Sequence, residues 1–339
     1  MEQTPHPIDA SVNTILPVLK SFPTNEVAII GCHALNLSRR SCEYDLLIVN
    51  RDPIPEKFIK VGEGYAKIIF RNERDVRQPD PQLALTLASA VPLRDSSLLL
   101  AGATSDCKRS FSANCRKSME TRLASSLKSL ARAEELLSEK ETQEADLSLL
   151  SAARDFAYAE LLMSEKVPSP SHVLGQIKAL PKRRPSSFKQ WADAFGLELA
   201  SRVSCENRFD ALSVIYDVLR TSAFEKETVV QMGRYREIEA IQVMEMKVGE
   251  LLSSMQSAEC FSFLGQEVVQ SLVDLYLLHV SRLSKEKNYS RVIRELTVGS
   301  DRLISEDVVK SLGLVRSPEI IRSAASGLKS AVSSLAKRI

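Results

Sequence analysis

The stretch EVAIIGCHALNLSRRSCEYDLLIV, residues 26–49, decides the fold expected for this chain. It opens with a buried apolar run that ends at Gly31 and closes with a second apolar run from Tyr44 to Val49. Runs of this length, rich in Val and Ile and bounded by a glycine or polar residues, predict two strands. The residues between them, about 33–40, are expected to form a short helical segment.

The surrounding sequence extends this unit on both sides. A third apolar run, Tyr65 to Phe70, follows two glycines at Gly62 and Gly64 and predicts another strand after a turn. Apolar residues at helical spacing predict a short helix over residues 8–20. Three strands and a helix in so short a span indicate a small α/β unit.

Two carboxylates, Glu43 and Asp45, mark the start of the second predicted strand. They stand two residues apart, so both point to one face of the strand. Neighbouring carboxylates repel each other unless a cation lies between them. Mg²⁺ takes one or two carboxylates together with phosphate oxygens of a substrate. The turn at Gly31 allows a close backbone approach, and a helix N-terminus after it favours phosphate. The pattern therefore predicts a phosphoryl-handling site.

This arrangement resembles the motif of the nucleotidyltransferase superfamily, which has the DNA polymerase β-like fold. The family motif runs Gly-Ser, a spacer, and then acid-hydrophobic-acid-hydrophobic. The minimal members of the family match this chain without gaps at Gly31, Ala34, Arg39, Asp45 and Leu46. Glu43 keeps the carboxylate with one more methylene, whereas Cys32 and Cys42 stand where the family has serines.

The resemblance implies Mg²⁺-dependent transfer of a nucleoside monophosphate from a nucleoside triphosphate (NTP) to an acceptor. It assigns the catalytic carboxylates and metal ligands to Glu43 and Asp45. Gly31 and Cys32 would cradle the phosphate of the nucleotide, and Arg39 would steady its charge. The acceptor would be a small molecule, a protein or an RNA.

A second hypothesis arises because the family usually takes a third carboxylate from a later strand. The predicted strand from Tyr65 to Phe70 offers Lys67 instead. The nearest acids along the chain lie outside this strand: Glu63, Glu73 and Asp75. In this hypothesis the fold is catalytically degenerate and acts as a nucleotide-binding or protein/RNA interaction module. A third carboxylate beside Glu43 and Asp45 would favour transfer, whereas Lys67 in that place would favour the degenerate protein.

The rest of the chain predicts helices. The expected fold class is α+β, predominantly α: a small N-terminal nucleotidyltransferase-like mixed sheet with helices, followed by helical bundles. Residues 8–100 are expected to form the sheet domain, 116–178 a helical bundle and 188–339 a second helical region whose helices offer a surface for a protein partner. Residues 101–115 are expected to be a loop and 178–189 a linker. The bundle resembles HEPN domains and the C-terminal bundles of kanamycin nucleotidyltransferases.

Composition excludes several classes of protein. The 339 residues hold 45 Lys+Arg and 43 Asp+Glu, a net charge of +2, which argues against a strongly cationic nucleic-acid coat. The six cysteines form no Cys-x-x-Cys pair and the four histidines are scattered, so no zinc pattern appears. Without a signal peptide or a long apolar run, the expected location is the cytoplasm, with reduced thiols and no membrane partner.

Overall fold

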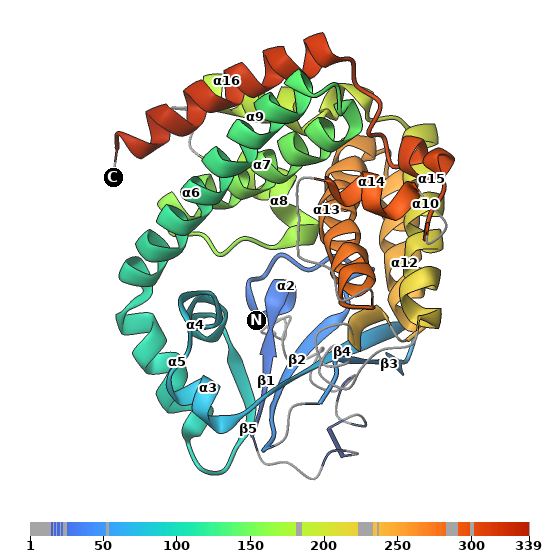
Figure 1. The fold of residues 1–339 in the computed structure, drawn as a ribbon. Helices are drawn as coiled ribbons and strands as arrows, with labels where there is room; N and C mark the ends of the chain where they lie inside the picture. The colour runs from blue at the N-terminus through green and yellow to red at the C-terminus, as the bar shows by residue number, and fades with distance from the viewer. Residues whose placement is uncertain are drawn as a thin grey trace. The chain divides into compact units, whose positions relative to one another are not determined.

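The computed structural model describes residues 15, 17, 19, 20, 22, 26–51, 54–180, 185–222, 233–235, 237–282, 291–298 and 302–338. Over these residues the fold is α+β and predominantly α, as predicted (Figure 1). The chain divides into two compact units. Unit 1 comprises Met1–Lys117 and Ala223–Glu250, and unit 2 comprises Ser118–Ser222 and Leu251–Ile339. The helix expected over residues 8–20 and the centre of the linker expected over 178–189 lie largely outside the described residues.

Unit 1 is built on a five-stranded mixed sheet with the strand order β3-β4-β2-β1-β5. Its strands are β1 (Glu26–Ile30), β2 (Tyr44–Val49), β3 (Lys57–Val61), β4 (Gly64–Arg71) and β5 (Val91–Asp95). β1 pairs antiparallel with β2 and with β5. β4 runs parallel to β2 and antiparallel to β3. The three strands predicted from the apolar runs are confirmed as β1, β2 and β4.

The two strands at the edges of the sheet, β3 and β5, were not predicted. β3 carries two lysines, Lys57 and Lys60, and β5 contains Pro92. Lysine and proline are common on edge strands, where they discourage pairing with another chain. The same residues weaken the apolar pattern by which a strand is recognised in sequence.

Alternate residues of the central strands supply two apolar layers, one on each face of the sheet. Leu46 packs in one layer with Ile29, and Leu47 packs in the other with Ala28. Three helices line the second layer: α3 (Glu73–Arg77), α4 (Pro81–Ala88) and α5 (Leu99–Arg109). Both faces of the sheet are therefore buried, which explains why β1 and β2 are almost wholly apolar.

Short capping contacts set the starts of these helices. The side chain of Asp80 accepts a hydrogen bond from the N–H of Leu83 at 2.8 Å, directly before Pro81 begins α4. Asp95 accepts from the N–H groups of Leu100 at 3.0 Å and Ala101 at 2.7 Å at the start of α5.

The prediction of a loop over residues 101–115 was wrong. α5 ends at Arg109, and α6 (Phe111–Ser138) begins two residues later. Small and polar residues hide the helical pattern in this part of the sequence. α5 nevertheless buries one side through residues at helical spacing: Leu100, Thr104 and Cys107.

Unit 2 consists of helices over its described residues. Besides the part of α6 from Ser118 onward, they are α7 (Thr142–Met163), α8 (Val173–Lys178), α9 (Pro185–Phe195), α10 (Arg202–Thr221), α13 (Ser257–Arg282), α14 (Val292–Thr297), α15 (Glu306–Ser311) and α16 (Pro318–Ala336). α13 packs along α10, and α9 packs between α7 and α16 (Figure 1). Of the helices that the structure describes, none combines the length and the apolar character needed to cross a membrane.

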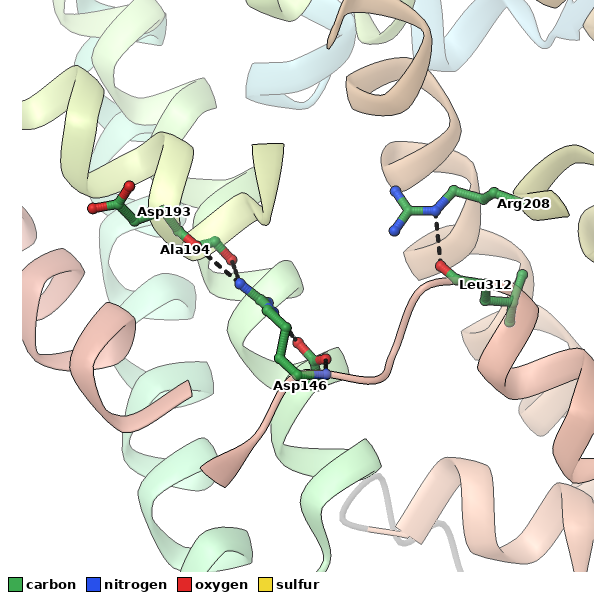
Figure 2. Close-up of polar contacts among 6 residues, drawn as sticks. Asp146, Asp193, Ala194, Arg208 and Leu312 are labelled. Carbon is green, nitrogen blue, oxygen red and sulfur yellow. Dashed lines mark hydrogen bonds and ion pairs between the residues drawn. The ribbon is translucent and has the colours of Figure 1, made fainter. Parts of the chain in front are cut away.

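Buried arginines join distant parts of unit 2. Arg208 of α10 donates from Nε to the carbonyl oxygen of Leu312 at 2.7 Å (Figure 2). Arg316 donates from Nε to Oδ1 of Asp146 at 2.8 Å. The same guanidinium donates to the carbonyl oxygens of Asp193 at 2.9 Å and Ala194 at 3.1 Å, in the last turn of α9. These contacts fix the segment between α15 and α16.

Candidate functional site

The acid pair lies at the start of β2, as the sequence predicted. Asp45 and Leu47 point to the same face of the sheet. Asp45 is the first residue that β2 places on this face, and unlike Leu47 it is not apolar. In the parallel register with β4, Asp45 stands directly beside Lys67. Side chains of registered neighbours point to the same face of a sheet. Lys67 therefore occupies the place next to Asp45 where the transfer hypothesis requires a third carboxylate.

A second lysine reaches the acid pair from a distant helix, α12 (Glu239–Ser253). Lys247 Nζ lies 2.6 Å from Oε2 of Glu43, and the two side chains are only 9% and 14% exposed. Burial alone would raise the pKa of Glu43, but the Lys247 ammonium and its hydrogen bond outweigh burial and lower that pKa. Burial would likewise lower the pKa of Lys247, but the Glu43 carboxylate raises it. Both groups are therefore charged at neutral pH.

Lys67 is itself paired with a carboxylate. Its Nζ lies 3.0 Å from Oε2 of Glu56, which directly precedes β3, and the side chains are 20% and 25% exposed. Burial opposes the ionisation of Glu56, but Lys67 lowers the pKa of this carboxyl below its ordinary value. Glu56 also acts electrostatically on Asp45. A third carboxylate is thus near the acid pair, and a lysine already neutralises it.

The acids that the sequence suggested for the third carboxylate have other partners. Glu63 is in the β3–β4 turn, 93% exposed, and pairs with Arg40. Glu73 pairs with Arg77 along α3. Asp75 lies on α3 as well, where its N–H donates to the Asn72 side chain.

Asp45 has no lysine of its own at bonding distance among the ion pairs of the described residues. Burial and the neighbouring Glu43 charge raise its pKa to about 7, although Lys67 and Lys247 partly counter this rise. The Asp45 carboxyl therefore holds its proton to a higher pH than an ordinary aspartate does. In the acid-lysine cluster (Glu43, Asp45, Glu56, Lys67 and Lys247), the two lysines offset the charges of Glu43 and Glu56.

Gly31 has a geometric role next to Asp45. It adopts the left-handed region, with φ of +69°, at the start of the four-residue helix α2 (Gly31–Ala34). A Cβ at this position would lie 3.0 Å from Cγ of Asp45 and closer still to one carboxylate oxygen. The space beside Gly31 is thus filled by the Asp45 carboxylate. Cys32, the other residue expected to cradle phosphate, is 6% exposed.

The helix expected over residues 33–40 is much shorter than predicted. It ends because Asn36 takes a left-handed conformation, with φ of 55°. The loop that follows is held by α12. Glu250 accepts hydrogen bonds from the N–H of Ser41, at 2.9 Å, and from its hydroxyl. Burial opposes the ionisation of Glu250, but the hydrogen bonds from Ser41, and to a smaller extent the Arg39 charge, lower the pKa of this carboxyl.

Sequence reasoning missed α12 as part of the site, although one signal was present. The buried stripe of this helix contains a single charged residue, with the spacing Ala240, Val243, Met244, Lys247 and Val248. A lysine on the apolar side of a helix needs a buried anionic partner. The identity of that partner was not visible, because Glu43 lies two hundred residues away along the chain.

The residues present do not fit Mg²⁺. This ion takes carboxylate oxygens as ligands, yet two of the three carboxylates here already hold ammonium groups at 2.6 and 3.0 Å. The third, Asp45, has a raised pKa of about 7 and lies against Gly31. Lys247 Nζ takes the position at Glu43 that a metal ion would need.

Comparisons with known proteins give little further help. No family model matches the chain, and no curated protein matches it. Among solved structures, the chain is similar to a nucleotidyltransferase-like protein from Exiguobacterium sibiricum 255-15, at 13% identity and a TM-score of 0.32, over 73% of this chain and 79% of that chain.

Proposed function

We propose that the chain is a binding module whose nucleotidyltransferase-like motif has lost metal-dependent transfer. This is the second hypothesis drawn from the sequence: a catalytically degenerate fold that binds a nucleotide, a protein or an RNA. The observation that carries it is the buried ion pair between Lys247 and Glu43, at 2.6 Å. A lysine that neutralises one carboxylate of the motif supplies internally the positive charge that Mg²⁺ would bring.

The register of the sheet supports the same proposal. Lys67 stands beside Asp45 and pairs with Glu56, so two lysines offset two carboxylates in the acid-lysine cluster. An Mg²⁺ ion entering this cluster would meet two ammonium charges at short range, which disfavours its binding. In this proposal Glu43 and Asp45 hold α12 and the Gly31 turn in place and do not activate a nucleotide.

Calorimetry with ATP, CTP, GTP and UTP tests the proposal directly. We expect that the parent protein gives no Mg²⁺-dependent binding with any of the four nucleotides. Binding that requires Mg²⁺ and disappears in Asp45→Asn would contradict the proposal and would support a working metal–triphosphate site, as the transfer hypothesis requires.

A second experiment tests the same proposal through a gain of metal binding. Lys247→Met removes one ammonium from the acid-lysine cluster and leaves Glu43 without its counter-ion. We expect this variant to bind Mn²⁺, a spectroscopic substitute for Mg²⁺, more tightly than the parent does. Lys247→Arg keeps the positive charge and is the matched control, for which no gain is expected. Equal Mn²⁺ binding by parent, Met and Arg variants would show that Lys247 does not take the place of a metal.

A further inference from the structure

Two cysteines meet beside the acid-lysine cluster although ten positions separate them in sequence. Cys32 lies in α2, and Cys42 ends the loop before β2. Their sulfur atoms lie within 4.8 Å of each other. The loop returns to this point through the left-handed Asn36 and through a turn in which the N–H of Cys42 donates to the carbonyl oxygen of Arg39 at 3.1 Å.

The surroundings of the two sulfurs differ. Cys42 Sγ accepts a hydrogen bond from the N–H of Arg39 at 3.3 Å, whereas the charge of Lys247 acts on both sulfurs. The Arg39 N–H favours a negative charge on the Cys42 sulfur. For Cys32, the hydrogen bond with Cys42 and then burial raise the pKa of the thiol, so this residue keeps its proton. One sulfur is thus arranged as an acceptor and the other as a donor.

We propose that Cys32 and Cys42 form a redox modification site at which a peroxide converts the two thiols to a disulfide. The Cys42 thiolate attacks one peroxide oxygen, the O–O bond breaks, and the leaving hydroxide takes a proton to become water. Cys42 is then a sulfenic acid. The Cys32 sulfur attacks the Cys42 sulfur, the S–O bond breaks, and hydroxide leaves with the Cys32 proton as a second water. Two electrons pass from the cysteines to the peroxide.

Geometry and access favour this pair and this class of oxidant. A disulfide requires the sulfurs to approach to about 2.05 Å. Between the two cysteines, residues 35–41 lie in neither helix nor strand, so the backbone of this loop can adjust. The cysteines are 6% and 7% exposed, which suits a small peroxide better than a protein oxidant.

Unit 2 offers a matched comparison. Cys205 and Cys260 are a second pair of cysteines that affect each other's pKa, and both are 0% exposed. If burial alone protected thiols, the two pairs would be oxidised at only slightly different rates. We expect instead that Cys32 and Cys42 are oxidised first. It does not depend on the proposed function, because it concerns the thiols whether or not the acid pair binds a metal.

Mass spectrometry of the reduced full-length protein tests the proposal. The protein is treated with hydrogen peroxide in the presence of a chelator, the remaining thiols are blocked, and peptides are mapped without reduction. We expect a Cys32–Cys42 linkage that forms at least about tenfold faster than any Cys205–Cys260 linkage and that a thiol reductant reverses. Equal rates for the two pairs, or sulfinic acid at Cys42 with no linkage, would contradict it.

Two conservative variants test the separate roles of the cysteines. In Cys32→Ser, Cys42 should stop at sulfenic acid, which a cyclic diketone traps. In Cys42→Ser, Cys32 should remain a thiol after the same treatment. Trapping at Cys32 in the second variant would overturn the assignment of Cys42 as the attacking sulfur. Because the main measurement uses the unmodified chain, the proposal stays testable even if a variant folds poorly.

Discussion

Asp45 is the residue at which the site departs most from the requirements of metal binding. Folding raises its pKa from 3.8 to about 7, mainly through burial and the nearby Glu43 charge. Between these two values the folded chain keeps a proton that the unfolded chain releases. The contribution of Asp45 to stability is therefore largest below its ordinary pKa. It falls as the pH rises through about 7, by up to about 1.4 kcal/mol per pH unit.

The Asp45→Asn variant lacks this ionisation. Relative to the parent, its free energy of unfolding should rise between about pH 4 and about pH 7, because only the parent loses stability there. Denaturant unfolding of both proteins at a series of pH values measures the difference. A constant difference across the series would mean that the pKa of Asp45 is close to its ordinary value.

Gly31 permits the close approach of the Asp45 carboxylate. Gly31→Ala places a Cβ 3.0 Å from Cγ of Asp45 at a φ of +69°, so both a clash and backbone strain are expected. Gly62 is the matched control: its φ is +61°, but a Cβ there meets nothing within 4 Å. Gly62→Ala should cost about 1–2 kcal/mol from the left-handed backbone alone. Gly31→Ala should cost clearly more, measured as free energy of unfolding, and similar losses would remove the argument for a steric role.

At the scale of elements, α12 is held to the sheet of unit 1 by polar contacts at several points. Gln242 accepts from the Tyr65 hydroxyl at 2.7 Å, Lys247 pairs with Glu43, and Glu250 accepts from Ser41. The three residues fall along about two turns of the helix on the side that faces β2 and β4. This helix therefore depends on partners that its own sequence does not reveal.

A double-mutant cycle measures the strongest of these contacts. Lys247→Met should cost about 3–5 kcal/mol, because it leaves Glu43 buried without a counter-ion. Adding Glu43→Gln removes that unpaired charge, so the double variant should be more stable than the sum of the single losses predicts. The pair Arg40–Glu63 in the same unit is the control, since its side chains are 89% and 93% exposed and should show no measurable coupling. Additive losses at Lys247 and Glu43 would argue that the ion pair is not formed.

The strands that were predicted from the sequence share an apolar pattern that is visible within each strand. Strands β1, β2 and β4 are mostly apolar, and the prediction that Glu43 and Asp45 share a face follows from strand alternation alone. The edge strands and α5 lack that signal, since lysine, proline and small polar residues interrupt the apolar pattern. The partners of the acid pair, Lys247 and Glu56, come from the tertiary fold. No spacing within residues 31–46 encodes them.

At the scale of the whole molecule, both units are assembled from separate parts of the chain. Residues 223–250 belong with the sheet of unit 1, and unit 2 resumes at Leu251. Unit 2 is therefore stabilised by contacts that are remote in sequence. Its buried arginines make several of them: Arg208 reaches Leu312, and Arg316 reaches Asp146 on α7 and the end of α9 (Figure 2).

Breaking the Arg316–Asp146 pair should test how far unit 2 depends on such contacts. The side chains are 4% and 1% exposed, so Arg316→Met would leave a carboxylate buried without a counter-ion and would remove a donor from two carbonyl groups of α9. We expect a loss of about 3–5 kcal/mol in the free energy of unfolding. Lys329→Met removes a half-exposed pair with Glu134 in the same unit and should cost only about 0–1 kcal/mol.

Arg316→Lys separates charge from geometry at this site. Lysine keeps the positive charge beside Asp146, but it cannot donate to the carboxylate and to the Asp193 and Ala194 carbonyls with one planar fork. Its stability should therefore lie between those of the parent and Arg316→Met when denaturant unfolding is followed by circular dichroism, which reports the loss of helix. If the Lys variant matches the parent, charge alone holds the segment between α15 and α16; if it matches the Met variant, the fork of hydrogen bonds from one guanidinium to two helices is what unit 2 requires.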